Sequence, residues 1–409
     1  SASNDVLAVP VVNADASGLH VGKAVKLLAP DEETYSLNMD NVWGVADFDG
    51  DGTEEVLVGS GSSGFVTLLK GDAVGSFQAH VVEMLGGSLA VATLGVPTYG
   101  DWDGDGVADL IIGDGQGLYN FYPGTDDPRV FAGGHFFTDR SGRVLKVDGI
   151  PNIQGPQEFA WGYTQPLIVD WDGDGVQDLI GNDNTATYRL LKQIDQGDPT
   201  KVDDTTLFTM NGEKLPVAWR SRPAVIDGKH QVAGDDRKVL LYLDIDQLLA
   251  LGVPEHDGSV SIDRVIHPSY TDGKPIQLAN WGGLSGRVAF SVVDWDEDGT
   301  WDVLFSSQSA NVTAFYGNKE EVRQNMYIHS HTSFWLRNAG TNSEPVFERA
   351  RRIRNADGSA IRVETHAGNV VPADLDGDGK ALDLIFCDGP GFVYYFMRDE
   401  LSWDEDPGE

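Results

Sequence analysis

Short apolar runs of four or five residues alternate with polar, glycine-rich turns along nearly the whole chain. Residues 65–69, 110–113 and 166–169 are typical runs, and each is too short to show the 3.6-residue period of an amphipathic helix. The nearest helix candidate, residues 246–251, would make one or two turns at most. The pattern therefore predicts an all-β chain of many short strands separated by turns.

One nine-residue phrase recurs five times between these runs. It has aspartates at positions 1, 3 and 5, a glycine at position 6 and, in four of the copies, a carboxylate at position 9. A hard cation that takes six to eight oxygen ligands suits alternate carboxylates on a tight loop, and the glycine permits the bend. The phrase predicts about five structural calcium sites. Their predicted ligands are Asp47, Asp49, Asp51 and Glu55; Asp101, Asp103, Asp105 and Asp109; Asp170, Asp172, Asp174 and Asp178; Asp294, Asp296, Asp298 and Asp302; and Asp374, Asp376 and Asp378.

A sixth copy of the phrase is degenerate. It keeps Asp227, but Lys229 and His230 stand where ligands are expected, so this copy should bind no metal. The first aspartates of the six copies lie 54 to 80 residues apart, whereas a four-stranded propeller blade takes roughly 40–50 residues plus loops. The longest step holds spare strand sequence at residues 326–336, which we interpret as a seventh blade.

The repeat therefore predicts a seven-bladed β-propeller, with six blades as the alternative. We expect residues 1–409 to form a single domain in which the N-terminal strand, residues 6–12, completes the last blade. Such closure leaves few strand edges exposed.

These aspartate phrases resemble the FG-GAP/VCBS-type repeats of calcium-loop β-propellers. Proteins with such repeats include integrin-like adhesion modules, fungal lectins and seven-bladed polysaccharide lyases that act on ulvan or on rhamnosyl-glucuronate linkages. Residues 334–341, with the Pro-Val-Phe sequence that starts at Pro345, are most similar to the lyase group. The resemblance implies a propeller fold and calcium, and it favours a carbohydrate-active protein.

The charge narrows the possible partners. A formal net charge of −35 does not favour binding to nucleic acid or to an anionic membrane surface. No run of 18 apolar residues is present, so we expect no membrane span.

The lone Cys387 cannot form an internal disulfide and is interpreted as a small buried hydrophobe. Calcium loops of ordinary affinity fill where calcium is abundant, which favours a secreted protein. Separately, we expect a monomer.

A ligand site is expected where the chain arrives at the propeller axis, just before each first strand. The positions seven residues before the first aspartates, and their neighbours, collect arginines and aromatic residues in a very acidic protein. This cluster favours an anionic ligand, although solvated arginines that balance nearby acids are an equal alternative. The positions are Asp40, Leu94, Tyr163, Arg220, Arg287 and Ala367, with Asn41, Trp161, Arg222 and His366 beside them.

The chemistry that suits these residue types is β-elimination at a uronic acid. An arginine neutralises the carboxylate so that the C5 proton can be removed, and a histidine and a tyrosine serve as base and acid. We assign His366 as the base and Tyr163 as the acid. Arg220, Arg222 and Arg287 hold the substrate carboxylate, and Asn41 and Trp161 contact the substrate.

Two further groups carry possible chemistry. His329 and His331 alternate on one strand face and could bind zinc, or could simply be half-buried packing residues. Residues 133–143 form an insertion with His135 and Arg143 that could be a substrate wall over the channel, or a plain β-hairpin.

The tryptophans divide into two groups. Three sit inside the calcium phrase and are expected to be core wedges, namely Trp102, Trp171 and Trp295. Five others are freer to stack on a sugar ring, namely Trp43, Trp161, Trp219, Trp281 and Trp335.

The predicted function is a polysaccharide lyase acting on an acidic glycan. One rival is a non-catalytic carbohydrate-binding or adhesion propeller, which would carry several equivalent pockets. The other is a glycoside hydrolase or a sugar dehydratase on the same scaffold, and a hydrolase would need paired carboxylates at the channel mouth.

Overall fold

Strands make up nearly all of the regular structure. The computed structural model describes residues 89, 91–149, 161–195, 197–278, 287–308, 331–359, 361, 370–387 and 392–405, and the backbone of the strands between residues 7 and 81. The chain divides into two compact units. Unit 1 is Ser1–Ala92 with Pro151–Ala160, and unit 2 is Thr93–Ile150 with Trp161–Glu409.

Unit 1 contains one four-stranded antiparallel sheet and two short strand pairs. The sheet follows chain order, with β5 (Asn41–Ala46), β6 (Glu55–Ser60), β7 (Val66–Ala73) and β8 (Ser76–Val81). The pairs are β1 (Leu7–Ala8) with β4 (Val25–Lys26), and β2 (Val11–Asp15) with β3 (Gly18–Val21). That residues 1–409 form one domain, with residues 6–12 completing the last blade, stays a prediction.

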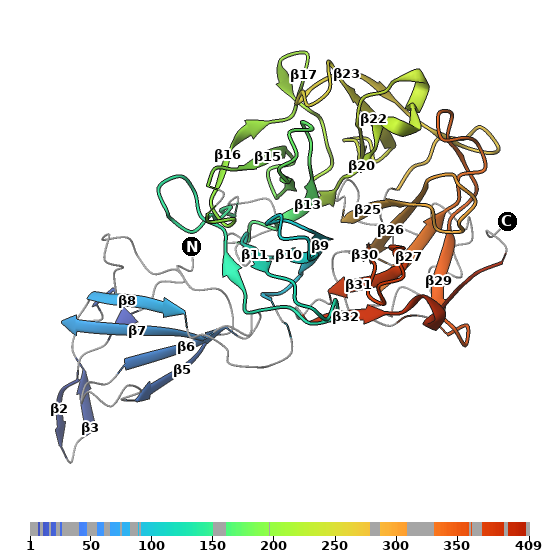
Figure 1. The fold of residues 1–409 in the computed structure, drawn as a ribbon. Coiled ribbons are helices and arrows are strands. Elements are labelled where there is room, and N and C mark those ends of the chain that lie inside the picture. The colour runs from blue at the N-terminus through green and yellow to red at the C-terminus, as the bar shows by residue number, and fades with distance from the viewer. Residues whose placement is uncertain are drawn as a thin grey trace. The chain divides into compact units, whose positions relative to one another are not determined.

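Unit 2 is a β-propeller whose described strands form five sheets, which we call blades A to E (Figure 1). Blade A comprises β9 (Val96–Gly100), β10 (Asp109–Gly113), β11 (Tyr119–Tyr122) and β12 (His135–Phe136). Blade B comprises β13 (Gln165–Val169), β14 (Asp178–Asn182), β15 (Tyr188–Gln193) and β16 (Val202–Leu207). In both blades each strand pairs antiparallel with the next, as short connecting turns require.

Blades C and D carry extra strands. Blade C comprises β20 (Ala224–Ile226), β21 (Val239–Leu243), β22 (Leu249–Pro254) and β23 (Ser261–Ile266), extended by β17 (Thr209–Met210) and β18 (Glu213–Lys214). Blade D comprises β25 (Val288–Val293), β26 (Asp302–Gln308), β27 (His331–Leu336) and β29 (Arg351–Asn355), with β19 (Ser221–Arg222) and β33 (Leu401–Trp403) at its edges.

Blade E has three described strands, β30 (Val370–Ala373), β31 (Asp383–Cys387) and β32 (Val393–Phe396). A separate parallel pair joins β24 (Ser269–Tyr270) to β28 (Val346–Phe347). Helical turns in the described residues are limited to three short 3₁₀ segments, η1 (Gly228–His230), η2 (Val232–Gly234) and η4 (Arg398–Glu400). The helix candidate at residues 246–251 is instead a turn that leads into β22. None of these helical segments is long and apolar enough to cross a membrane.

The first strands of the five blades meet around one axis, which we call the hub. Contacts join β9 to β13, β13 to β19, β20 to β25, β25 to β30 and β30 back to β9, so the ring of unit 2 closes with five blades. The prediction of seven blades is therefore wrong for this ring, and the six-bladed alternative also exceeds its count. Residues 326–336 were expected to form a blade of their own, but the described part of this segment, His331–Leu336, is β27, the third strand of blade D.

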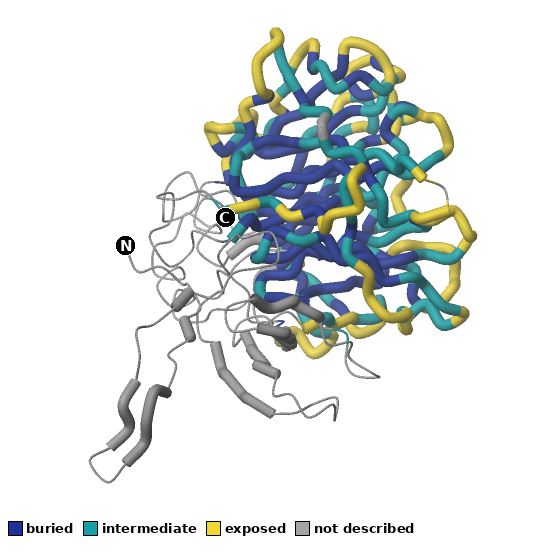
Figure 2. Tube along the Cα trace, turned by 90° about the vertical axis from the view of Figure 1, so that its left-hand side faces the viewer, coloured by how far each residue is buried: buried dark blue, intermediate teal, exposed yellow. Residues whose placement is uncertain are grey.

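The tryptophans of the calcium phrase are core wedges, as the sequence predicts. Trp102, Trp171 and Trp295 are almost completely buried, and each lies in an apolar cluster that its own blade shares with the next blade. Cys387 is also buried, and its strand β31 is buried along its whole length. Burial in unit 2 is concentrated in the strands, while the connecting loops are exposed (Figure 2). A ligand would therefore contact the loops of the propeller rather than its sheets.

Candidate functional site

The aspartate loops join the first and second strands of blades A, B, D and E, and each first aspartate organises its own loop. Asp101 accepts hydrogen bonds from the backbone N–H groups of Gly104 at 2.9 Å and Gly106 at 3.1 Å. Both glycines have positive φ, of 77° and 89°, a conformation that glycine adopts without strain. The same pair of bonds recurs from Asp170 and Asp374.

The ninth carboxylate ties the loop to the blade. Asp109 accepts from the N–H of Trp102 at 2.8 Å and from the N–H of Gly124 at 2.8 Å, and burial raises its pKa to about 6. Burial likewise raises the pKa of Asp178 to about 6 and that of Asp302 to about 7. These are the desolvated carboxylates of their loops, and a nearby cation would favour their ionised form.

Four loops gather carboxylates closely enough to hold one ion, with candidate ligand atoms within 4.8 Å of one another. Asp172 Oδ1 and Asp296 Oδ1 are buried and accept no hydrogen bond from the described part of the chain, so both loops contain an acceptor that a cation would satisfy. An all-carboxylate oxygen set suits calcium rather than a softer metal. The groups are Asp101, Asp103 and Asp109; Asp170, Asp172 and Asp178; Asp294, Asp296 and Asp298; and Asp374, Asp376 and Asp378.

The groups differ in part from the predicted ligand sets. Asp105 and Asp174 each accept from the N–H two residues further on and lie outside the groups of their loops. Asp302 is also outside the group of its loop, and Trp295 N, Trp335 Nε1 and Asn338 N donate to its two oxygens. Asp47, Asp49 and Asp51 lie outside the described residues, as does the side chain of Glu55 at the start of β6.

Sequence reasoning missed the ninth carboxylate of the last loop. In blade E this role belongs to Asp383, which accepts from the N–H of Leu375 at 2.9 Å and from the N–H of Arg398 at 2.7 Å. One extra residue in this loop moves the acid from the ninth position to the tenth. The signal was available as an aspartate at the start of the strand that follows the loop.

The degenerate copy in blade C has a different local structure. Residues after Asp227 form η1 and η2, and Asp227 Oδ1 accepts from the N–H of Lys229. Nearby, Asp235 is neutralised by Arg237 and Arg264. Within residues 227–238, all described, no carboxylate group with metal-binding spacing occurs. That this copy binds no metal stays a prediction.

The positions seven residues before the first aspartates are structurally equivalent. We call the four described members, Leu94, Tyr163, Arg220 and Arg287, the approach residues. All four are non-glycine residues in the left-handed region, with φ of 62°, 55°, 52° and 60°. Such a conformation is strained for these residue types and persists only where the surroundings impose it. The repeat therefore fixes the direction of the chain just before each first strand.

Four of the predicted ligand residues, Trp161, Tyr163, Arg220 and Arg287, come together at the face where the chain approaches the first strands. The guanidinium carbon of Arg220 lies 3.1 Å from the centroid of the Tyr163 ring and 4.5 Å from that of Trp219. The ring of Trp161 meets Tyr163 edge to face, with centroids 5.5 Å apart. Arg287 joins through its backbone, since its N–H donates to Arg220 O at 2.8 Å. We call these five residues the approach cluster.

Exposure divides the approach cluster. Tyr163 and Arg220 are buried, with 4% and 1% of their surface exposed, whereas Trp161, Trp219 and Arg287 are half-buried. Trp161 Nε1 is buried and has no hydrogen-bond acceptor among the described residues. A ligand at this face would therefore meet two indole rings and one guanidinium first.

Arg222 lies at the hub instead of at the face. It is completely buried, and it donates to Phe290 O at 2.9 Å, Ser291 Oγ at 2.8 Å and Val370 O at 2.7 Å, and also to Pro97 O. All four acceptors are neutral oxygens, and burial lowers its pKa to about 9. The assigned contact between Arg222 and a substrate carboxylate does not fit this position, because its donors are used inside the ring.

The insertion at residues 133–143 is a β-hairpin packed on blade B. Thr138 forms a bridge with Val144 and another with Lys201. His135 lies on the outermost strand of blade A, and the exposed Arg143 is held by Asp139. The segment is thus a hairpin, and a contact of His135 or Arg143 with substrate stays a prediction.

Several predicted site residues lie outside the described part of the chain. They are His366, His329 and the side chains of Asn41 and His331, so the catalytic base and the zinc pair stay predictions. Trp43 and Trp281 also fall there. Trp335 is not free to stack on a sugar, because it is buried and its Nε1 donates to Asp302 Oδ2 at 2.9 Å.

Comparison with known proteins places a recognised repeat in this chain. Residues 47–112 match the model of the FG-GAP-like repeat family, which spans the first two aspartate phrases. No curated protein matches the chain.

Solved structures similar to this chain are distant. An Agrocybe aegerita lectin, described as recognising non-reducing terminal N-acetylglucosamine, is 16% identical over 97% of this chain and 92% of its own, with a TM-score of 0.32. AofleA from Arthrobotrys oligospora is 12% identical over 86% of both chains, with a TM-score of 0.31. NanB with Optactamide is 10% identical over 98% of this chain and 55% of its own, with a TM-score of 0.33.

Proposed function

We propose that this protein is a calcium-stabilised β-propeller that binds carbohydrate bearing carboxylate groups at the approach cluster. The observation that carries the proposal is the series Trp161, Tyr163 and Arg220. The two rings meet edge to face, the guanidinium stacks on Tyr163, and the buried Trp161 N–H has no acceptor among the described residues. The calcium expectation rests on the four carboxylate groups and on the FG-GAP-like repeat.

The residue types fit a sugar acid. An indole face packs on the apolar face of a pyranose ring, and an unsatisfied N–H donates to a hydroxyl or carboxylate oxygen. The half-buried Arg287 supplies a fixed cation for the carboxylate in a protein of net charge −35. The strained backbone at Tyr163, Arg220 and Arg287 holds the cluster in place before a ligand arrives, which lowers the entropic cost of binding.

Binding without chemistry fits the cluster best, because Arg220 is stacked between two aromatic rings and Arg222 is used inside the hub. A uronate lyase is the second candidate. The contact between Tyr163 and Arg220 favours it, since β-elimination needs a phenol near a cation that holds the carboxylate. His366 would supply the base. Secretion and a monomeric state stay predictions.

The test is calorimetric titration of the calcium-saturated protein with uronate-containing and neutral oligosaccharides of equal length. We expect binding of the acidic series only, and at least tenfold weaker binding by Trp161→Ala (about 1.4 kcal/mol). Equal binding of both series would remove the carboxylate preference, and no binding of either would remove the proposal. Growth of ultraviolet absorbance from an unsaturated uronate product would assign the lyase instead of the binding protein.

A further inference from the structure

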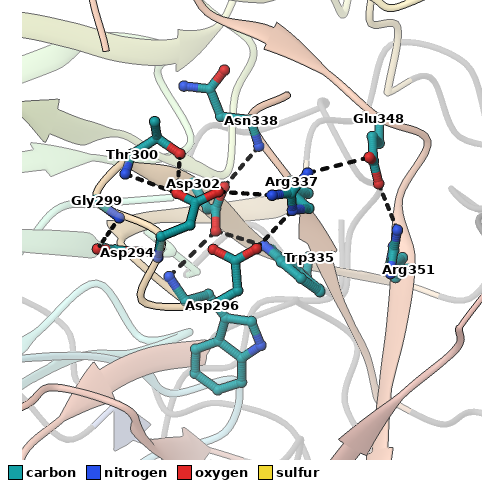
Figure 3. Close-up of polar contacts among 12 residues, drawn as sticks. Asp294, Asp296, Gly299, Thr300, Asp302, Trp335, Arg337, Asn338, Glu348 and Arg351 are labelled. Carbon is teal, nitrogen blue, oxygen red and sulfur yellow. Dashed lines mark hydrogen bonds and ion pairs between the residues drawn. The ribbon is translucent and has the colours of Figure 1, made fainter. Parts of the chain in front are cut away.

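The calcium loop of blade D contains a cation of its own. Arg337 follows β27 and donates from Nε to Asp296 Oδ2 at 2.6 Å and from Nη2 to Asp298 Oδ2 at 2.7 Å (Figure 3). Both acceptors belong to the group of carboxylates that could hold the ion. Glu348 accepts from Nη1 at 3.4 Å, which helps to hold the guanidinium in this position. One bidentate arginine thus neutralises part of the loop.

Blade B has the same arrangement with a lysine. Lys192 on β15 lies opposite Asp178 in the strand register and forms an ion pair with Asp172 Oδ2. Asp172 and Asp178 are both members of the metal-binding group of this loop. Arg337 occupies the corresponding place in blade D, since it directly follows Leu336, which pairs with Val303. The residue opposite the ninth carboxylate is therefore basic in two blades.

Blades A and E have neutral residues at this place. In blade A, Leu110 pairs with Tyr122, so the residue opposite Asp109 is Pro123. In blade E, Leu384 pairs with Phe396, so the residue opposite Asp383 is Met397. No described lysine or arginine side chain bonds to a carboxylate of residues 101–109 or 374–383. Lys380, which belongs to the blade E loop, pairs with Glu297 of the blade D loop instead.

In blade C, basic side chains pair with the ninth carboxylate and no metal-binding group is present among its described residues. Its copy of the phrase has no metal-binding group, and its Asp235 is paired with two arginines, Arg237 and Arg264. The five blades therefore form a series. It runs from loops whose carboxylates bond to no described lysine or arginine side chain, through loops with one such partner, to the blade C loop, where Asp235 pairs with two arginines.

We propose that Arg337 and Lys192 lower the calcium affinity of their own loops, so that residues 101–109 and 374–383 fill at lower free calcium than residues 170–178 and 294–302. A calcium ion at blade D or B must displace or share carboxylates that already have a bonded cationic partner. At blades A and E no described lysine or arginine side chain bonds to the carboxylates, because Lys380 of the blade E loop pairs with Glu297 of blade D. Coulombic competition at this distance is worth about tenfold in affinity for partly exposed groups. When calcium is scarce, Lys192 stabilises the aspartate loop of blade B, and Arg337 stabilises the aspartate loop of blade D.

The experiment is equilibrium dialysis of the calcium-stripped full chain against graded free calcium, which gives the number of ions bound and their affinities. We expect two affinity classes in the wild type. Arg337→Met should move one site from the weaker class to the tighter one, with a dissociation constant about tenfold lower, and Lys192→Met should move another. The control is Arg354→Met, which removes an ion pair with Asp404 far from any aspartate loop in the sequence and should change no site.

A reverse variant keeps the test decisive if Arg337→Met folds poorly. Met397→Lys places a cation opposite Asp383 and should move one site from the tighter class to the weaker one. In chelator, Arg337→Met should melt below the wild type, whereas in saturating calcium the two should melt together. Unchanged isotherms in all three loop variants, a single affinity class in the wild type, or no bound calcium at all would overturn the proposal.

Discussion

The guanidinium of Arg222 on β19 donates a 2.7 Å hydrogen bond to the backbone carbonyl of Val370 on β30, across the hub. The same side chain reaches Phe290 on β25 and Pro97 on β9. One buried cation therefore joins the first strands of blades A, D and E to the strand that leads into blade C. Its acceptors are mostly carbonyls at the ring's centre, where a shorter side chain could not satisfy them.

Replacement of Arg222 by methionine should destabilise the propeller. Four buried oxygens lose a donor, and the gain from removing a buried charge offsets this only in part, so we expect a loss of about 3 kcal/mol in the free energy of unfolding. Urea unfolding measures it. Arg129→Met, which removes an exposed ion pair with Asp127, is the matched control and should leave the midpoint unchanged. An equal midpoint for both variants would mean that the hub does not depend on Arg222.

Calcium removal should lower the melting temperature. Each ion bound at 100 times its dissociation constant adds about 2.7 kcal/mol, and a chain of this size loses roughly 2–4 °C per kcal/mol. Excess chelator should therefore shift the melt by more than about 5 °C, and restored calcium should reverse the shift. Differential scanning calorimetry checks both steps. An unchanged melt in excess chelator would contradict the calcium assignment.

Asp114 should make stability fall as pH rises. It is completely buried in the turn after β10, where Leu118 N and Asn120 Nδ2 donate to it, and burial raises its pKa from 3.8 to about 6. Between about pH 4 and pH 6 the folded chain keeps this proton while the unfolded chain releases it. The contribution is thus present in acid and is lost as pH rises through about 6.

Asp114→Asn removes this titration. Relative to the variant, the wild type should lose about 3 kcal/mol of unfolding free energy between pH 4 and pH 7. Urea titrations of both proteins across this range give the difference, in which effects common to the two cancel. Parallel pH profiles would show that Asp114 is ionised in the folded protein throughout.

Arg287→Ala should weaken binding of acidic oligosaccharides about tenfold, or about 1.4 kcal/mol, and should leave any neutral ligand unaffected. Arg287 is the half-buried arginine of the approach cluster, so part of its side chain lies at the surface where a carboxylate would bind. Arg349→Ala is the matched control, because Arg349 stacks on Tyr270 and pairs with Asp272 outside the cluster. Titration calorimetry compares them. Equal losses in both variants would point to net charge instead of a site.

The recurring aspartate phrases were sufficient to predict all-β structure, the loop positions and the buried tryptophans. These features depend on local chemistry, because a carboxylate at position 1 bonds to backbone groups three and five residues away. Counting seven residues back from each first aspartate also identified structurally equivalent positions, since Tyr163 and Arg287 share one unusual backbone conformation. The ninth acid of blade E was missed because one inserted residue displaced Asp383.

The sequence by itself determined which segments pair as neighbours and where oxygen ligands gather, since both follow from contacts between residues close along the chain. Only the tertiary structure decided the number of blades in the ring and the separate roles of Arg220 and Arg222. Ring closure depends on β9 meeting β30, strands far apart in sequence, and no local pattern encodes that meeting. Arg220 and Arg222 are only two residues apart, yet Arg220 stacks on the Tyr163 ring and Arg222 lies among backbone carbonyls at the hub. The surrounding blades, not the local sequence, determine these different environments.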